Sequence, residues 1–330
     1  MDYNEKTFAV APMMDWTDRH CRVFHRTLTR SALLYTEMVT DQAVRHGDRN
    51  KLLGFDGCEH PIALQLGGSN PHGLAEASCI GEGFGYDEIN LNVGCPSDRV
   101  KGGHFGACLM AEPKLVAECL AAMQAAVKIP VTVKCRIGID DQDEEQALDE
   151  FVEAVAEAGC KTFIIHARKA WLKGLSPKQN REIPPLNYDR VVRLKAANPT
   201  LHISLNGGLV TVADGLTHLE TLDGIMLGRV AYHNPWELTQ GDPTFTGQPA
   251  PVATRHEAAV AMLPYIEKHL ATGAPLHHIT RHMLGLYHAQ AGGRIWRQIL
   301  TVDGSKHGAG VEVLYKALGA VSEQARQVAA

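Results

Sequence analysis

Short apolar runs recur at regular intervals along the first three quarters of the chain. Each run is nearly continuous rather than alternating with polar residues, which is typical of strands covered on both faces. Eight such strands are predicted: Phe8–Ala11, Leu33–Val39, Pro61–Leu66, Glu88–Val93, Val131–Ile137, Thr162–Ala167, His202–Leu205 and Gly224–Leu227.

Segments with helical spacing of apolar residues lie between these runs. The predicted helices are Arg19–Thr29, Pro71–Gly83, Lys114–Val127, Glu144–Ala158, Tyr188–Ala197 and Val210–Leu219. Repeated strand–helix units over this length predict a (β/α)8 TIM barrel. A doubly wound sheet is the main alternative, but its G-x-G-x-x-G signature does not follow the first strand, which ends in Ala11-Pro12-Met13-Met14-Asp15.

The pattern changes after residue 242. Glycine and proline recur in a linker-like stretch, and from residue 253 onward the sequence is helical, with no strand-like run. We therefore predict a barrel domain over residues 1–242, a linker over 243–252 and a smaller all-helical domain over 253–330.

Composition places the chain among ordinary globular proteins. Of its 330 residues, 45% are hydrophobic and 21% are charged, and the net charge is −5. No apolar run approaches the roughly 20 residues of a membrane span, and the polar start lacks signal-peptide order. We expect a cytoplasmic protein without membrane or protein partner. Its eight dispersed cysteines contain no C-x-x-C pair, so most are expected to be reduced core residues and no metal site is predicted.

Polar, cationic or glycine-rich groups follow every predicted strand. In a barrel the carboxyl ends of the strands meet at one mouth, where active sites lie. Cys95 follows the fourth strand, and its loop carries Arg99, Lys101 and His104 among Gly102, Gly103 and Gly106. A thiol beside cations on a pliable backbone predicts an anionic substrate and a loop that opens and closes over it.

Lys134 and His166 end the fifth and sixth strands, and Gln65 ends the third. A lysine among apolar residues needs an anion or an electron-rich partner, so these three side chains are expected to bracket a flat heteroaromatic ring. The alternatives are an ion pair of Lys134 with Glu37 or Asp15, and a hydrogen-bonded core histidine at 166.

The last two strands end in Asn206-Gly207-Gly208 and Gly228-Arg229. Glycine lets backbone N–H groups approach a phosphate, and Arg229 adds a charged fork. A phosphate site is predicted here, with simple turns as the alternative.

Two tracts rich in basic residues contain no acid. Residues 168–181 hold Lys178 and Arg181 with Trp171 among them, and residues 268–302 hold Arg294 and Arg297 with five histidines. In a chain of net negative charge they predict local contacts to nucleic acid, with a solvated face as the alternative. His278 and His282 have helical metal-ligand spacing, but no third ligand is apparent.

The chain resembles the tRNA-dihydrouridine synthases, and within them the bacterial A-type subfamily. The resemblance is carried by Ala11–Thr17, Leu91–Ser97, Val133–Gly138, Ile165–Arg168, Asn206–Gly208 and Met226–Arg229, and for the subfamily by Ala170–Lys178 and Gly293–Gln298. It implies bound FMN, with Pro12, Met13 and Met14 against the flavin ring. Gln65, Lys134 and His166 would contact the ring and ribityl chain, and Asn206, Gly207, Gly208, Gly228 and Arg229 would hold the phosphate.

The implied reaction is reduction of the C5–C6 double bond of a D-loop uridine, expected at position 20 or 20a of tRNA. NADPH would reduce the flavin, which passes hydride to C6 of the base. Cys95 fits as the acid that protonates C5, because a thiol with a pKa near 8.5 is mostly neutral. Asn92 would bind the uracil edge, and Lys178, Arg181, Arg294 and Arg297 would orient the tRNA. The alternatives are a dihydroorotate-dehydrogenase-like enzyme on a free pyrimidine, and an RNA-binding protein that merely retains the barrel.

Overall fold

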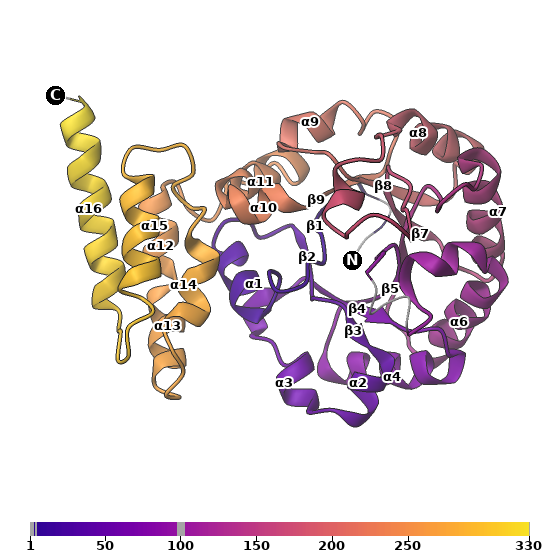
Figure 1. Ribbon diagram of the computed structural model, residues 1–330, viewed down its shortest axis with the longest axis horizontal. Helices are drawn as coiled ribbons and strands as arrows, with labels where there is room; N and C mark the ends of the chain where they lie inside the picture. Colours follow the sequence, from indigo (N-terminus) through magenta and orange to yellow (C-terminus); the bar gives the residue numbers. More distant parts are fainter. Residues whose placement is uncertain (1–2, 4, 98–102, 330) are drawn as a thin grey trace. The chain divides into compact units, whose positions relative to one another are not determined.

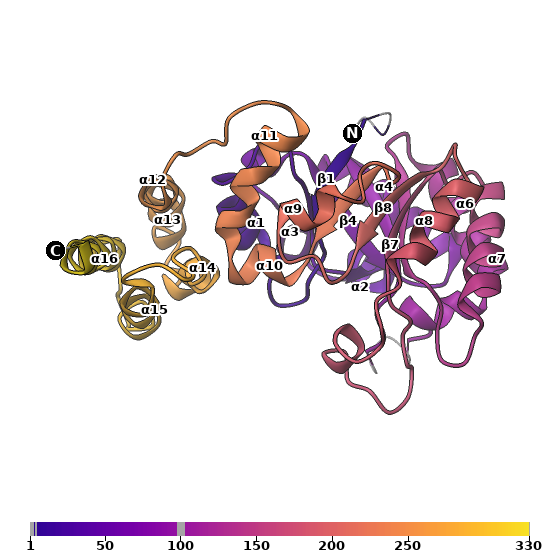
Figure 2. The same ribbon diagram turned by 90° about the horizontal axis from the view of Figure 1, so that it is seen from above.

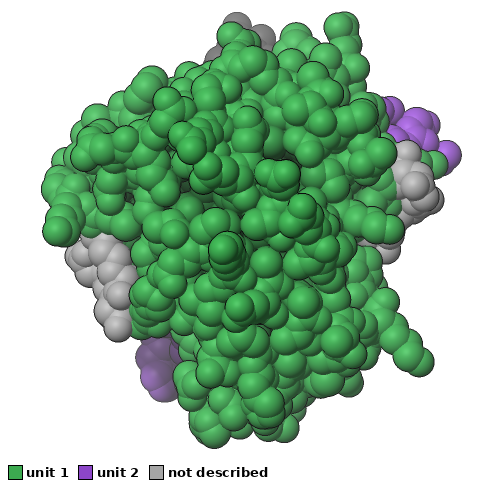
Figure 3. Space-filling model, turned by 90° about the vertical axis from the view of Figure 1, so that its right-hand side faces the viewer, with its two compact units in different colours: residues 1–14, 33–228 green, residues 15–32, 229–330 purple. Residues whose placement is uncertain are grey.

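The computed structural model describes residues 3, 5–97 and 103–329, with side chains as far as residue 322. Arg99, Lys101 and Gly102 of the predicted cysteine loop lie outside the described residues. By compactness the chain divides into a first unit of residues 1–14 and 33–228 and a second unit of 15–32 and 229–330 (Figure 3). The predicted domain boundaries at 242 and 253 remain a prediction.

The first unit is a closed barrel of eight parallel strands, which confirms the predicted fold class. Neighbours pair in the order β2-β1-β9-β8-β7-β6-β5-β4, and a pairing of β2 with β4 closes the ring (Figure 1). The barrel strands are β1 (Thr7–Val10), β2 (Leu33–Tyr35), β4 (Ile62–Gly67), β5 (Glu88–Val93), β6 (Val131–Arg136), β7 (Thr162–His166), β8 (His202–Asn206) and β9 (Gly224–Leu227).

The predicted strand Leu33–Val39 is interrupted. It forms β2 and a separate short strand β3 (Val39–Thr40), which pairs with the far end of β4. The break lies at Thr36, whose hydroxyl accepts a hydrogen bond from the Gln65 backbone N–H at 3.0 Å and donates to the carbonyl of Glu37 at 2.7 Å. A side chain thus takes over part of the backbone ladder, which a pattern of apolar residues does not reveal.

Helices surround the barrel, and five of them match predicted segments closely or in part. Those five are α4 (Pro71–Phe84), α6 (Pro113–Ala126), α7 (Glu144–Glu157), α8 (Tyr188–Ala197) and the shorter α9 (Val212–Leu216). Thr211 and Asp214 form a capping box at α9, so that helix begins later than predicted. Two short helices between β3 and β4 were not predicted: α2 (Asp41–His46) and α3 (Arg49–Leu53).

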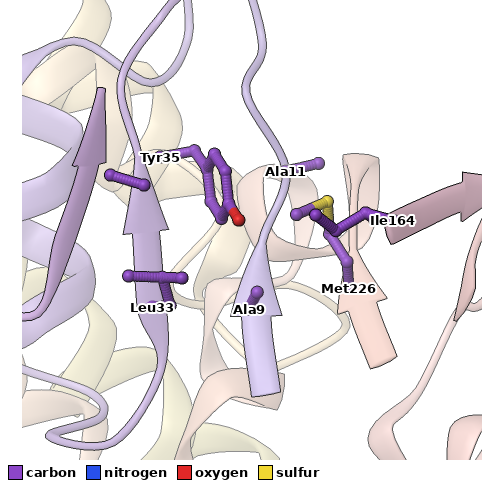
Figure 4. Close-up of a cluster of buried hydrophobic side chains, with 7 residues drawn as sticks. Ala9, Ala11, Leu33, Tyr35, Ile164 and Met226 are labelled. Carbon is purple, nitrogen blue, oxygen red and sulfur yellow. The ribbon is translucent and has the colours of Figure 1, made fainter. Parts of the chain in front are cut away.

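The barrel interior has an apolar floor built from small and large side chains of different strands. Tyr35, Leu33, Ile164 and Met226 are almost wholly buried there with three alanines, Ala9, Ala11 and Ala63 (Figure 4). Only about 10 Å³ of space remains within this layer. The interior is therefore packed at this level, and a ligand has to bind above it, at the strand ends.

The second unit consists of helices and connecting loops, with no strand among its described residues. Its helices are α1 (Arg19–Arg26), α10 (Arg229–His233), α11 (Gly241–Phe245), α12 (Arg255–Ala261), α13 (Leu263–Leu270), α14 (His277–Met283), α15 (Gly293–Val302) and α16 (Glu312–Ala329). Helix α1 matches a predicted segment, and α11 covers part of the predicted linker. No helix in the described part of either unit has the length and hydropathy of a membrane span.

Asp18 ties α1 to α14 within this unit. Its carboxylate caps α1 by accepting from the N–H groups of His20 and Cys21 at 2.9 and 3.0 Å. It also accepts from Arg281 at 2.6 Å and pairs with the buried ring of His282 at 3.0 Å. Burial alone would favour the neutral acid, but these hydrogen bonds outweigh it and hold the pKa of Asp18 well below its usual value.

Replacing Asp18 by alanine removes a helix cap and leaves a buried imidazole unpaired. We expect the free energy of unfolding at pH 7 to fall by about 2–4 kcal/mol, and by less for Asp18→Asn, which keeps a capping oxygen. Because the folded-state pKa is lowered, this contribution is complete above about pH 4 and declines as the pH falls further. Urea unfolding measures it, and Asp303→Asn, at an exposed ion pair, is the control. Equal losses in Asp18→Ala and Asp303→Asn would contradict the assignment.

Candidate active site

Cys95 lies where β5 turns into its loop, as predicted. The carboxamide oxygen of Asn92 accepts from the backbone N–H groups of Gly94 and Cys95 at 3.1 and 2.9 Å, which forms a tight turn below the thiol. The carbonyl of Cys95 accepts from Ala107 N–H at 2.9 Å, and its half-buried Sγ lies 3.6 Å from the hydroxyl oxygen of Ser97. Hydrogen bonds to Asn92 and to Ala107 therefore fix the backbone that carries the thiol.

The described part of the cysteine loop resumes at Gly103. His104, predicted as a loop cation, pairs through Nε2 with Glu112 at 2.9 Å and has a left-handed backbone at φ 52°. Gly106 is also left-handed, at φ 73°, before a 3-10 turn over Gly106–Ala111. The imidazole of His104 is thus partnered by a carboxylate within the protein.

Gln65 and Asn92 lie together at the mouth of the barrel. Asn92 Nδ2 donates to Gln65 Oε1 at 2.8 Å, and Gln65 Nε2 donates to Asn90 Oδ1 at 2.8 Å. All three amides are nearly inaccessible to solvent. The structure therefore brings two predicted ligand-binding residues into one hydrogen-bonded group beside the thiol.

Lys134 lies opposite Asn92 in the register of β5 and β6. Its ammonium donates to Asn206 Oδ1 at 2.9 Å, and Asn206 in turn donates to the backbone carbonyl of Met226 at 2.8 Å. Burial, reinforced by the charge of Arg136, lowers the pKa of Lys134 to about 8. Among the described residues Lys134 forms no ion pair with Glu37. Because the ammonium has three hydrogens and one hydrogen bond, to Asn206, two hydrogens remain for another partner.

Arg136 joins the cysteine turn to the loop after β7. Its Nε donates to the carbonyl of Gly94 at 2.8 Å, and its Nη1 donates to the carbonyls of Lys169 and Asn180 at 3.0 and 3.1 Å. Burial is the main cause that lowers its pKa to about 10. A single buried guanidinium thus braces two loops that carry predicted functional residues.

His166 lies at the mouth among several positively charged side chains. Burial holds its pKa well below the usual value, and the charges of Arg136, Lys134, Arg168 and Arg181 lower it further. The ring is therefore neutral at physiological pH, and the surrounding cations favour an anionic ligand. No hydrogen bond from the His166 ring to the described protein residues is present, which leaves both ring nitrogens available.

Gly207 and Gly208 both need to be glycine for reasons within the fold. Their backbones are left-handed, at φ 105° and 74°. A Cβ on Gly207 would lie 2.6 Å from the His166 ring, and one on Gly208 would lie 2.4 Å from Leu186 and 2.5 Å from the Tyr188 hydroxyl. The alternative that these glycines form simple turns is therefore sufficient to explain them. Their role in binding a phosphate remains a prediction.

Gly228 differs from the other two glycines. A Cβ built on it would meet no atom within 4 Å, and its φ is not left-handed, so open space rather than backbone strain surrounds it. Asn206 is held near this region, because its Nδ2 donates to the carbonyl of Met226, two residues before Gly228. Arg229 is exposed and begins α10 in the second unit, and its predicted role as phosphate ligand is not addressed by either unit alone.

Pro12, Met13 and Met14 follow β1 at the mouth. Met13 packs on the apolar floor of the barrel, Pro12 is half-buried, and Met14 is 54% exposed. An exposed methionine above a packed apolar layer is suited to contact a flat ring. Their predicted contact with flavin remains a prediction.

The loop between β7 and α8 extends beyond the strand ends of the barrel (Figure 2). Asn180 is fully buried within it and bonds both the N–H and the carbonyl of Trp171, at 2.7 and 2.9 Å. Lys178 and Arg181, on either side of Asn180, are exposed, and Trp171 is 37% exposed. The loop is therefore internally braced and presents its basic residues outward.

In the second unit, α15 presents Arg294 and Arg297 to solvent. Trp296 between them is fully buried and donates from its indole to the carbonyl of Met283 at 2.9 Å. The tryptophan of this tract is thus a core residue that orients the two arginines. Part of the predicted basic tract is neutralised, because Arg281 and His282 pair with Asp18.

Three side chains that organise the site were assigned no role from the sequence. Asn180 holds the basic loop, Tyr188 donates to the carbonyl of Gly207 at 2.8 Å, and Asn90 bonds Gln65. Only Asn90 had a signal in the sequence. It alternates with Glu88 and Asn92 in an otherwise apolar strand, which indicates one polar face of β5.

Comparison with known proteins identifies the family. The family described as Dihydrouridine synthase (Dus) matches residues 9–321. The chain belongs to the dihydrouridine synthase family. Members of this family are flavin-dependent oxidoreductases that reduce uridine in tRNA. The predicted family, enzyme class and reaction are therefore confirmed at this level, and Cys95, Lys134 and His166 lie at the active-site end of a dihydrouridine synthase barrel.

Relatives extend over nearly the whole chain. The tRNA-dihydrouridine(20/20a) synthase of Xanthomonas campestris is 55% identical over 322 residues, which is 98% of this chain and 96% of the relative. That of Shewanella oneidensis is 57% identical over 310 residues, covering 94% and 92%.

A solved structure, the old yellow enzyme homologue from Zymomonas mobilis, superposes with a TM-score of 0.51. The superposition covers 74% of this chain and 89% of that one. At 11% identity it supports the barrel fold alone.

Removal of the buried lysine charge tests the electrostatics of this dihydrouridine synthase site. In the ligand-free protein we expect Lys134→Met to be more stable than the wild type by about 1–3 kcal/mol at pH 7, because the wild type keeps a desolvated ammonium below its lowered pKa. The difference should shrink as the pH rises from about 8 to about 10.5, since the folded wild type loses its proton before the unfolded chain does. The variant should also retain less flavin.

Urea unfolding across this pH range measures the difference, with the exposed Lys161→Met as control. A pH-independent difference would contradict the assignment.

Proposed function

We propose that this dihydrouridine synthase uses FMN, accepts electrons from NADPH, and reduces uridines 20 and 20a in the D-loop of tRNA. The position is supported by the names of the relatives, which are tRNA-dihydrouridine(20/20a) synthases. A cytoplasmic location follows from the tRNA substrate. The single observation that carries the chemistry is the thiol of Cys95, held beside two amides and the Lys134 ammonium at one barrel mouth.

The residues at the mouth fit FMN in kind. Lys134 and Arg136 place two positive charges beside the neutral ring of His166, which suits an anionic cofactor, and the apolar floor lies beneath them. Lys134, His166 and Gln65 each have hydrogens or lone pairs available for a polar ring edge. Open space beside Gly228 leaves room for a phosphate, which Asn206, Gly207, Gly208 and Arg229 are proposed to bind.

FMN bound here would supply the hydride for C6 of the base. The protein orients the base and moves a proton. Asn92 presents a carboxamide to the uracil edge, and Cys95 Sγ donates a proton to C5. Lys134 and Arg136 place two positive charges near the sulfur, which carries a negative charge after proton transfer.

Substitution of Cys95 by alanine tests the proton donor. We expect FMN content and NADPH oxidation to be retained, while dihydrouridine formation on unmodified tRNA falls about 100- to 10,000-fold. Mass spectrometry of digested tRNA measures the product, and NADH in place of NADPH tests the reductant.

Cys108→Ala is the matched control, because Cys108 is a half-buried thiol on the neighbouring 3-10 turn. Wild-type product formation by Cys95→Ala would exclude the assignment. Reduction of free orotate or uracil by the wild type, with tRNA left unmodified, would favour the free-pyrimidine alternative.

Each unit offers an exposed basic pair for the tRNA backbone. We expect Lys178→Ala/Arg181→Ala and Arg294→Ala/Arg297→Ala each to weaken tRNA binding. Each should also reduce the slope of log K against log salt by about one for every phosphate that the removed side chains had neutralised. The effect should be similar for different tRNA sequences, because binding to the backbone carries no base information.

Filter binding at several salt concentrations measures both effects. The control is Lys128→Ala/Lys161→Ala, two exposed lysines at the other ends of β6 and β7. An unchanged salt slope in both test pairs would refute a role in tRNA binding.

A further inference from the structure

A chain of hydrogen bonds begins at a carboxylate deep in the barrel. Glu88 is fully buried, and its Oε1 accepts from the hydroxyls of Tyr35 and Thr132, both at 2.6 Å. The hydroxyl of Tyr3 donates to its other oxygen. Asn90, two residues along the same strand, donates from Nδ2 to the hydroxyl oxygen of Thr132 at 2.8 Å. The carboxylate is thereby connected to the first amide of the strand.

The same chain continues to the backbone of Cys95. Asn90 Oδ1 accepts from Gln65 Nε2, Gln65 Oε1 accepts from Asn92 Nδ2, and Asn92 Oδ1 accepts from the N–H groups of Gly94 and Cys95. Every link is between 2.8 and 3.1 Å. The chain therefore runs along one face of β5 without a gap.

The direction of every bond in the chain is determined by its two ends. A backbone N–H can only donate, so the side-chain oxygen of Asn92 must point to the turn. The side-chain nitrogen of Asn92 must then point to Gln65. Gln65 must then face Asn90 with its nitrogen, and Asn90 must donate to Thr132. The hydroxyl proton of Thr132 is left to point at Glu88, which is an acceptor. The backbone N–H groups of the turn do not permit the opposite orientation, so each amide of the chain has one orientation.

We propose that Asn90 and Thr132 are positioning residues, which fix the Gln65 and Asn92 amides with one N–H of each facing the barrel mouth. Among the described residues, the second hydrogen of each amide nitrogen has no protein partner. Such donors suit carbonyl oxygens, one on the pyrimidine ring of the flavin and one on the uracil base. This inference rests on the proposed function, because the ligands it names are those of that reaction.

Alternatively, this chain of hydrogen bonds only gives partners to buried polar groups and so contributes to stability alone. A second polar cluster in the same barrel allows the two roles to be separated. Thr7, His202 and Ser204 bond one another at 3.0–3.1 Å near the start of their strands, and within the described structure none of them bonds an amide of the β5 chain. Loss of a bond there should cost stability alone, whereas loss of a bond in the β5 chain should also change the flavin and the turnover.

Asn90→Leu tests the proposal in the FMN-loaded enzyme. Leucine has a similar volume but no acceptor for Gln65, so the Gln65 amide keeps its bond from Asn92 but loses the bond that holds its nitrogen. We expect a shifted flavin absorption spectrum and reduction potential. We also expect kcat for tRNA to fall about 10- to 100-fold, with KM little changed, because misplacement of a reacting group has effects of this size. Ser204→Ala should leave spectrum, potential and kcat at wild-type values.

Asn90→Asp provides the conservative rescue. One aspartate oxygen still accepts from Gln65, and the carboxyl, close to Glu88, takes up a proton that can be donated to Thr132. This variant should recover most of the turnover and the wild-type spectrum. If Asn90→Leu does not fold, Thr132→Val removes the neighbouring link and should shift the spectrum in the same direction.

Three results would overturn the proposal. They are a wild-type spectrum and kcat in folded, flavin-loaded Asn90→Leu, equal losses in Asn90→Leu and Ser204→Ala, or no recovery in Asn90→Asp. The flavin measurements need no tRNA. A wild-type enzyme that forms no dihydrouridine would therefore refute the proposed function, while the spectra and potentials would still decide this inference.

Discussion

Water is excluded from the inside of a closed barrel, so each polar group placed there must find its partner in the protein or in a ligand. This constraint explains why the polar residues of the mouth occur in connected groups rather than singly. Glu88 has three hydroxyl donors, and Arg136 has three carbonyl acceptors from separate segments. The same bonds that satisfy these groups also set the geometry of the cysteine turn and of the basic loop.

At the mouth of the barrel, two buried polar side chains lack a full set of protein partners. Lys134 is buried with one hydrogen bond and no counter-ion among the described residues, and the neutral His166 is surrounded by cations. Such an arrangement costs stability in the empty protein and favours an anionic, flat partner in its place. The same residues therefore lower the stability of the empty protein and favour binding of the cofactor, as is common at ligand-binding sites.

The sequence predicted the barrel because its strands are covered on both faces and their apolar runs are nearly continuous. It also placed Cys95, Lys134, Gln65 and His166 correctly at the mouth, since strand ends follow directly from strand positions. It did not predict the break at Thr36, where a side chain replaces part of the ladder. Nor did it predict the neutralisation of Arg281 by Asp18, because a count of acids within a tract cannot include a carboxylate 263 positions away in the chain.

That distance has a consequence for how the protein is made. Helix α1 leaves the ribosome early, but its capping carboxylate meets Arg281 and His282 only after most of the polypeptide has been synthesised. At about 5–20 residues per second the wait is on the order of tens of seconds. During that time the part of α1 that packs against α14 in the folded protein stays uncovered. The nascent chain therefore has to complete α14 before this part of the second unit can take its folded form.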